Sequence, residues 1–210
     1  MALVRGAKKI NLLLNKIIMP LNQKYFKTLS TVFADWEKSR RSVQEASANA
    51  LQKAKQAIFS FHRNNWKEAE VLLKTALENI KIAGKLQEKS IATDDEGIFK
   101  SSLEEYAEAE LFRQFLYKET IGPIKNLEIS PETYMGGLAD LVGEIQRYAM
   151  KMATERNFSE LTRAEKVTEE IMGAILSFNF TGYLRTKFDQ AKGARRKIEE
   201  IAYEVSLRQK

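Results

Sequence analysis

Proline and glycine are scarce in this sequence, and apolar residues recur with a helical period between them. Only three prolines and ten glycines occur in 210 residues. Because proline breaks helices and glycine weakens them, long stretches without either residue favour continuous helices. No stretch alternates between apolar and polar residues as a half-buried strand would. We therefore expect an all-α chain.

Local start and stop patterns divide the chain into helices. Ser130 followed by Pro131 is typical of a helix start, and Gly122-Pro123 is typical of a stop. We expect helices over about residues 23–63, 65–87, 98–118, 131–156, 160–177 and 183–208. With 44% hydrophobic residues the chain can bury a sizeable core. The sequence thus predicts one domain, a bundle of six or seven long antiparallel helices.

The composition narrows the chemistry that this chain can perform. The absence of cysteine excludes disulfides, thiolate catalysis and Cys-ligated metal sites. It also suits a reducing cytoplasm, which is the location we expect. The formal charge of +6 and the pI near 9.3 favour an anionic partner, most commonly nucleic acid. No apolar run reaches the roughly 20 residues of a membrane span, so we expect no membrane association.

The first 30 residues carry six basic residues and no acidic one. Lys16 interrupts their apolar run, and the small residues of a signal cleavage site are absent. We therefore expect residues 1–30 to form a basic N-terminal extension or a first helix that packs on a neighbour. A targeting segment is the less favoured alternative. Residues 31–210 are expected to form the helical domain.

Two pairs of acids lie on predicted helices. Glu105 and Glu108 extend an apolar stripe, and Asp140 and Glu144 share a stripe on the helix that begins at Pro131. Acids three positions apart repel each other, so a cation is expected to offset their charge. Carboxylate oxygens are preferred ligands of Mg²⁺ and Mn²⁺. If the two helices pack side by side, the four acids predict a metal site suited to phosphodiester hydrolysis.

The four acids have two interpretations other than this metal site. They can be ordinary surface acids, because 30% of the chain is charged and such pairs are common on helices. Gly136, Gly137 and Gly143 weigh against that, since three helix-weakening residues indicate that something approaches the backbone closely. A di-iron bundle needs Glu-x-x-His pairs. The residue three positions before the single histidine, His62, is Phe59 and not Glu, which argues against a di-iron site.

Basic residues in several places are candidates for contacting nucleic acid. The last helix has eight bases against four acids, an excess that can neutralise phosphates or form a solvated face. Phe59, Phe61 and Trp66 can stack on bases or belong to the core. Lys55 lies on an apolar stripe, so it either faces the acidic residues or buries its stem. The candidate contacts are Lys55, His62, Arg63, Arg147, Arg185, Lys187, Arg195 and Arg196.

Four segments, in this order, resemble the translin family, which comprises translin and translin-associated factor X. They are KAKQAIFSFHR at 53–63, EEYAEAELFRQFL at 104–116, YMGGLADLVGEIQRYAM at 134–150 and LRTKFDQAKGARRKIEEIAYEVSLR at 184–208. The match spans roughly residues 35–208. The resemblance implies an all-α fold of about seven helices, assembly into a hollow octamer-like shell, and binding of RNA or single-stranded DNA.

The sequence is most similar to the factor X branch, which carries a magnesium-dependent endoribonuclease centre. The family's E-Y-x-E-A pair matches Glu105 and Glu108, and its A-D-L-x-G-E segment matches Asp140 and Glu144. Translin, which binds nucleic acid without being the catalytic subunit, lacks the Asp of that segment. The resemblance therefore implies that the four acids are catalytic and hold Mg²⁺, with Mn²⁺ as an alternative.

The chain ends directly after the YEVSLR segment, without the longer tail of eukaryotic members. We therefore expect a compact prokaryotic homologue that assembles with itself into a homo-octamer, with a translin-like second subunit as an alternative. The predicted function is cleavage of single-stranded RNA inside an oligomeric shell. The alternative is a non-catalytic protein of the translin type that binds RNA or single-stranded DNA.

Overall fold

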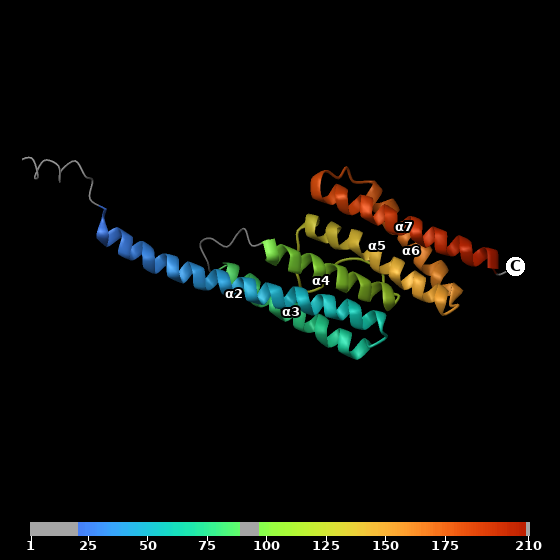
Figure 1. Ribbon diagram of the computed structural model, residues 1–210, viewed down its shortest axis with the longest axis horizontal. Coiled ribbons are helices and arrows are strands. Elements are labelled where there is room, and N and C mark those ends of the chain that lie inside the picture. Colours follow the sequence, from blue (N-terminus) through green and yellow to red (C-terminus); the bar gives the residue numbers. More distant parts are fainter. Residues whose placement is uncertain (1–20, 89–96, 209–210) are drawn as a thin grey trace, which may run out of the picture.

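The computed structural model describes residues 21–88 and 97–208, and these residues form six helices and no strand (Figure 1). The helices are α2 (Gln23–His62), α3 (Trp66–Glu88), α4 (Gly97–Leu116), α5 (Pro131–Thr154), α6 (Phe158–Leu176) and α7 (Gly182–Arg208). The predicted all-α class is confirmed, and the helix bounds agree with expectation to within about two residues. None of the described helices combines the length and apolarity needed to cross a membrane.

The helix starts follow from capping residues in the sequence. The Ser130 hydroxyl accepts a hydrogen bond from the backbone N–H of Thr133 at 3.1 Å, and Pro131 occupies the first turn of α5. The Asn157 side chain accepts from the backbone N–H of Glu160 at 3.4 Å and caps α6. Such caps satisfy donors that the first turn leaves without a helical partner. They therefore fix where α5 and α6 begin.

The helices α4 and α5 form the centre of the bundle. On one side α2 packs along α4, and on the other side α7 packs along α5 (Figure 1). The helix α3 covers α2, and α6 lies against both α5 and α7. This order places one face of the α4–α5 pair between α2 and α7.

A continuous core fixes the rotation of α4. Phe61 from α2 and Phe112 and Phe115 from α4 are at most 1% exposed. The ring centroid of Phe112 lies 6.3 Å from that of Phe61 and 6.2 Å from that of Phe115. Burial of each large aromatic side chain contributes roughly 2 kcal/mol. Because Glu105 and Glu108 share the stripe of these phenylalanines, the same packing fixes the direction of their side chains.

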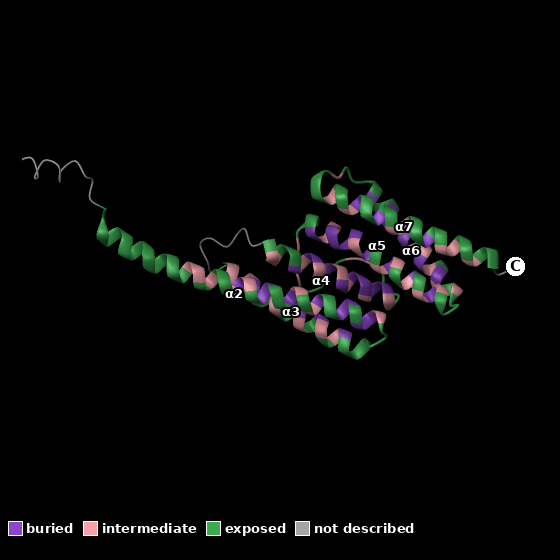
Figure 2. Ribbon diagram, in the orientation of Figure 1, coloured by how far each residue is buried: buried purple, intermediate pink, exposed green. Residues whose placement is uncertain are grey.

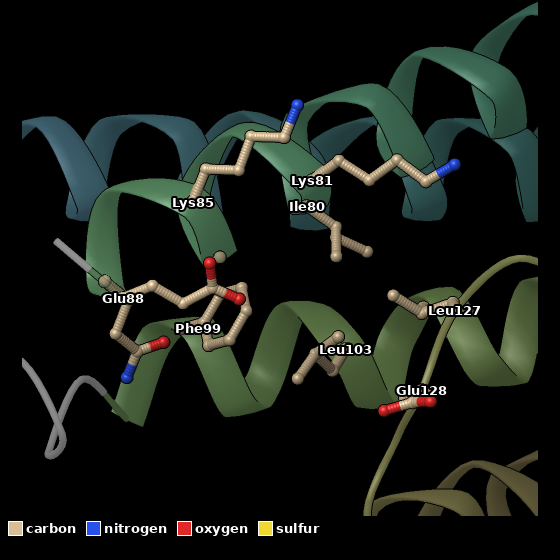
Figure 3. Close-up of a pocket in the computed structure, with 10 residues that line it drawn as sticks. Ile80, Lys81, Lys85, Glu88, Phe99, Leu103, Leu127 and Glu128 are labelled. Atoms are coloured by element: carbon tan, nitrogen blue, oxygen red, sulfur yellow. The ribbon is translucent and has the colours of Figure 1, made fainter.

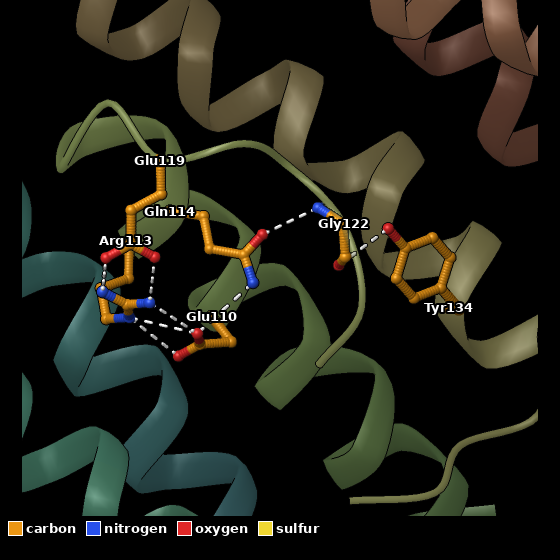
Figure 4. A network of polar contacts seen from close by, with 6 residues as sticks. All are labelled: Glu110, Arg113, Gln114, Glu119, Gly122 and Tyr134. Atoms are coloured by element: carbon orange, nitrogen blue, oxygen red, sulfur yellow. Dashed lines mark hydrogen bonds and ion pairs between the residues drawn. The ribbon is translucent and has the colours of Figure 1, made fainter. Parts of the chain in front are cut away.

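A polar network ties the end of α4 to the start of α5 (Figure 4). Arg113 pairs with Glu119 at 2.8 Å, and Gln114 accepts a hydrogen bond from the backbone N–H of Gly122 at 2.9 Å. The hydroxyl of Tyr134 on α5 donates to the carbonyl of Gly122 at 3.1 Å. These contacts hold the connecting segment against both helices. They therefore limit how far α4 and α5 can slide past each other.

The first part of α2 projects beyond the bundle (Figure 1), and every residue from 21 to 35 is exposed (Figure 2). Residues 23–30, predicted to belong to a basic extension or a first helix, form the first turns of α2. Residues 1–20 of that predicted segment lie outside the described part of the chain.

Candidate active site

Four carboxylates meet on the face of α4 and α5 that lies between α2 and α7. Glu105 and Glu108 come from α4, and Asp140 and Glu144 come from α5. Burial, together with the charges of the other three carboxylates, raises the pKa of Glu108 to about 9. Burial also raises the pKa of Glu105 and of Asp140. The four predicted acids therefore interact, and we call them the acidic cluster.

The two acidic helices approach each other closely at two glycines of α5. A Cβ atom added at Gly137 would lie 2.9 Å from the backbone nitrogen of Glu108 and 3.0 Å from the carbonyl oxygen of Glu104. A Cβ atom added at Gly136 would overlap the carboxylate of Glu104. The predicted close approach is thus confirmed at these two positions. At Gly143 an added Cβ would meet no described atom of this chain within 4 Å.

Replacing Gly137 by alanine is expected to lower the free energy of unfolding by about 2 kcal/mol, because the methyl group must push α4 and α5 apart. Gly143→Ala on the same helix is the matched control. It is expected to raise the free energy of unfolding by about 0.5–1 kcal/mol, since alanine is the better helix former. Urea unfolding followed by circular dichroism measures both effects, and a stabilising Gly137→Ala change would contradict the close helix contact.

Basic groups from α2 and α7 flank the acidic cluster. The Lys55 Nζ atom lies 3.7 Å from Oε2 of Glu105, and the side chain is 60% exposed. On the α7 side, Lys187 contacts the carboxylate of Asp140, and its Nζ atom lies 3.0 Å from Oε1 of Glu104. The carboxylates of the cluster therefore lie between two lysines, one from each flanking helix.

The single histidine of the sequence lies at the α2 edge of the acidic cluster. The His62 Nε2 atom is hydrogen-bonded to Glu144, and the His62 side chain is only 6% exposed. Its ring packs on Phe112 at a centroid distance of 4.7 Å, and Lys151 donates to its backbone carbonyl at 2.8 Å. Arg147 lies 3.9 Å from Glu144 and is half-exposed. His62, predicted as a nucleic-acid contact, is thus placed to orient a carboxylate.

The other predicted nucleic-acid contacts lie on the surface of α7 and just after the end of α2. Arg63 lies over the ring of exposed Phe59, 5.4 Å from its centroid. Arg185 and Arg195 each pair with an acid one turn further along α7, at 3.1 and 2.8 Å, and Arg196 is exposed. In the part of the chain that the structure describes, none of these four arginines pairs with the acidic cluster.

Two residues of the site were not predicted. Glu104 is 8% exposed and accepts a hydrogen bond from the hydroxyl of Tyr183 as well as the ion pair from Lys187. Glu104 lies four residues before Glu108, a spacing that places both on one helix face. This spacing could have indicated that Glu104 lies near the site. No sequence pattern indicated Tyr183, which reaches the site only because α7 packs on α5.

The chemistry of these side chains fits a hard divalent cation. Carboxylates are the ligands that Mg²⁺ and Mn²⁺ prefer, and such an ion would offset the negative charges that add to burial in raising the pKa of Glu108. Among the described residues, however, no group of three Asp, Glu or His side chains is placed to hold a metal ion. Lys55 and Lys187 each pair with one carboxylate of the acidic cluster instead, and His62 is hydrogen-bonded to Glu144. Binding of an ion would therefore require the two lysines to move away from Glu105 and Asp140.

The cavity drawn in Figure 3 is separate from this site. It has a volume of about 520 Å³ and lies between α3 and α4, where Ile80, Phe99, Leu103 and Leu127 form its apolar wall. Lys81 and Lys85 extend from α3 at its edge (Figure 3). Its described lining includes no carboxylate of the acidic cluster. The candidate active site is therefore the face between α2 and α7.

Solved structures of C3PO proteins have folds similar to that of this chain. The chain is similar to the crystal structure of AfC3PO, with a TM-score of 0.76 and 24% identity over 87% of this chain and 97% of that one. For apo-NeC3PO the TM-score is 0.79, with 19% identity over 89% and 98% of the two chains. For AfC3PO in complex with duplex RNA it is 0.64, with 24% identity over 88% and 94%. These structures share the helical fold.

A sequence relative is an uncharacterized protein of Methanocaldococcus jannaschii, 29% identical over 110 residues. The match spans about half of this chain and about half the length of that relative, 50% of each. The sequence model of the translin family matches residues 38–209, a range that includes α3 to α7 and most of α2. The chain therefore belongs to the translin family.

Proposed function

We propose that this chain is a metal-dependent endoribonuclease that uses Mg²⁺, or Mn²⁺ in its place, to cleave single-stranded RNA. The observation that carries the proposal is the acidic cluster, in which burial, together with the charges of carboxylates from two helices, raises the pKa of Glu108 to about 9. Strongly perturbed carboxylates in a site flanked by lysines favour catalysis over a purely structural role. AfC3PO, which shares the fold, has been solved with duplex RNA.

Asp140 supports assignment to the factor X branch of the family. This acid stands where translin has none, and the structure places it against Lys187 at the α7 edge of the acidic cluster. Because the two branches of the family differ at this position, Asp140 favours a cutting enzyme over a binding protein.

The acidic cluster supplies the ligands in the proposed mechanism. Glu105, Glu108, Asp140 and Glu144 would hold the ion, which when bound would activate water and stabilise charge on the phosphate oxygens. His62 orients the Glu144 carboxylate through its hydrogen bond, and the ring packing on Phe112 keeps the imidazole in place. A carboxylate held in one direction needs less reorganisation when an ion binds.

The flanking bases would position the RNA backbone. Lys55 and Arg147 lie at the cluster with half or more of their side chains exposed, so both can reach a phosphate beside the carboxylates. Arg185, Arg195 and Arg196 on α7 are placed for sequence-independent phosphate contacts further along the strand. Exposed Phe59 beside Arg63 offers a ring on which a base can stack.

A nuclease assay across metal and salt conditions tests this function. Labelled single-stranded RNA, single-stranded DNA and duplex RNA are incubated with Mg²⁺ or with EDTA, and binding is measured in EDTA over a salt series. We expect cleavage of single-stranded RNA only with the metal, and binding that weakens as salt rises. Salt-sensitive binding without cleavage would instead assign the non-catalytic translin-type function. A protein that neither binds nor cuts would be a helical scaffold.

We also propose that the chain self-associates through the projecting part of α2, as a homo-octameric shell requires. Large apolar side chains on this part are 41–59% exposed and lie on one stripe of the helix: Tyr25, Phe26, Leu29, Val32 and Phe33. An exposed apolar stripe of this length is typical of an interface. A helix that leaves the bundle also gains little stability until another surface covers it.

Charges on the α2 stripe are expected to reduce the size of the assembly. Leu29→Glu with Val32→Glu would place two carboxylates in the apolar interface, where their desolvation opposes contact. Thr31→Glu is the control, because its side chain lies on the other side of the same exposed turn. Light scattering coupled to size exclusion should show a smaller particle for the double variant only. A wild-type protein that is monomeric would overturn the proposed self-association.

A further inference from the structure

Lys187 is shared between two carboxylates that belong to different helices. Its Nζ atom contacts Asp140 on α5 and lies 3.0 Å from Oε1 of Glu104 on α4. The Lys187 side chain is 18% exposed, so the ammonium group is largely withdrawn from water. A lysine in such a position is stabilised by its acidic partners and would be costly to leave without them.

The two partners of Lys187 differ in what surrounds them. Asp140 belongs to the acidic cluster, whereas Glu104 lies outside it and also accepts a hydrogen bond from Tyr183. The absence of a side chain at Gly136 provides the space that the Glu104 carboxylate occupies. Glu104 is therefore a second position for the Lys187 ammonium group, next to the cluster but not part of it.

We propose that Lys187 is an internal counter-cation that neutralises Asp140 until a divalent ion binds, and then transfers its contact entirely to Glu104. Lys187 is thus a positioning residue, because it controls access of the ion to Asp140. The inference rests on the proposed metal-dependent function and adds to it a competition between the lysine and the ion. It also explains why Asp140, whose chemistry suits a metal ion, pairs with a lysine and why no three acids among the described residues are placed to hold an ion.

The competition predicts tighter metal binding when the lysine charge is removed. A unit charge and a divalent ion a few ångströms apart repel each other enough, even in water, to change affinity roughly tenfold. Lys187→Met keeps a long unbranched side chain, one atom shorter than that of lysine, and removes the charge. We therefore expect its dissociation constant for Mn²⁺ to be lower than that of the wild type by roughly a factor of ten.

Calorimetric titration with Mn²⁺ and thermal unfolding in EDTA or Mn²⁺ test this prediction without measuring activity. Lys197→Met is the matched control, because Lys197 lies on the same helix and its one partner among the described residues is exposed Glu200, at 2.9 Å. Lys187→Met should melt at a lower temperature than the wild type in EDTA and show the larger rise when Mn²⁺ is added. Equal Mn²⁺ affinity in Lys187→Met and Lys197→Met would overturn the inference.

Glu104 provides a second, independent test of the transfer. Glu104→Gln leaves every carboxylate of the acidic cluster intact, but it weakens the position to which Lys187 would move. We expect this variant to bind Mn²⁺ several-fold more weakly than the wild type. In the Lys187→Met background the same substitution should have little effect, because there is no lysine left to accommodate. Equal effects in both backgrounds would show that Glu104 acts on the ion directly and would overturn the transfer.

The outcomes distinguish this inference from the proposed function. If the wild type binds Mn²⁺ but Lys187→Met binds it no more tightly, the inference is wrong and the metal site stands. If Lys187→Met binds Mn²⁺ and the wild type does not, the lysine blocks the site completely, which supports the inference. If no variant binds Mn²⁺, the proposed metal site is wrong and the inference is rejected with it.

Discussion

Asp140→Asn is expected to reduce cleavage of single-stranded RNA at least about a hundredfold while RNA binding changes only a few-fold. The amide keeps the size of the side chain and removes the charge that a cation requires. Glu108→Gln should have a similar effect, since Glu108 comes from the opposite helix of the same cluster. Single-turnover cleavage in Mg²⁺ measures the first quantity, and filter binding in EDTA measures the second.

Glu132→Gln is the matched control for these two variants. Glu132 lies on α5 like Asp140, but its side chain is 48% exposed and pairs with Lys100 at 2.6 Å, outside the cluster. Its loss should leave cleavage and binding unchanged. If Asp140→Asn or Glu108→Gln cleaved RNA as fast as the wild type, the acidic cluster would not be the active site. Loss of both binding and cleavage would instead indicate a folding defect, which circular dichroism would detect.

The helices could be predicted because their limits are set locally. Ser130 and Asn157 cap the backbone N–H groups of the turns that follow them, and a cap depends only on neighbouring residues. The projection of α2 could not be predicted, because the first turns of this helix carry the same apolar period as the buried part. Whether a stripe is covered depends on where the other helices end.

The acidic site could be predicted only in part. Glu104, Glu105, Glu108 and Glu110 are four similar acids in one short run of α4, and the sequence singled out only Glu105 and Glu108, without a role for the other two. Glu110 pairs with Arg113 in the network that holds the α4–α5 connection (Figure 4). The roles of the other three depend on side chains from α2, α5 and α7, so they follow from the packing of distant segments.

Gly136 and Gly137 were the sequence feature that pointed beyond ordinary surface acids. Both permit the close contact of α4 and α5, whereas Gly143, which looked alike in sequence, has no neighbouring helix this close among the described residues. A glycine in a helix therefore indicates a close approach without telling which neighbour makes it. The same limit applies to Lys187, whose charge predicted a phosphate contact but whose position places it between two carboxylates.

The metal-free protein is expected to lose stability as the pH rises from about 5 to about 8. The pKa of Glu108 is about 9 in the folded protein, against a reference value of 4.5. Between these values the folded state keeps a proton that the unfolded chain has released, so the free energy of unfolding falls with increasing pH. At about 1.4 kcal/mol for each pKa unit, the loss over this range is at most about 4 kcal/mol.

The surroundings of Glu108 explain this loss. Burial is the largest cause of its raised pKa, and the negative charges of Glu105, Asp140 and Glu144 add to it, while the ammonium group of Lys187 lowers the pKa. Glu108→Gln cannot ionise, so it should be more stable than the wild type at pH 8 and close to it at pH 5. A weaker slope of the same sign should remain, because the pKa of Glu105 and of Asp140 is also raised by burial.

Urea unfolding in EDTA at pH 5, 6.5 and 8 measures this difference, and Glu132→Gln should follow the wild type at every pH. Parallel curves for Glu108→Gln and the wild type would show that Glu108 is ionised in the folded protein. Added Mg²⁺ should reverse the trend, because an ion binds the ionised carboxylate and its affinity rises as the proton leaves. The pH at which Mg²⁺ first stabilises the wild type therefore reports how strongly the cluster holds its proton, and that proton is what the ion must displace.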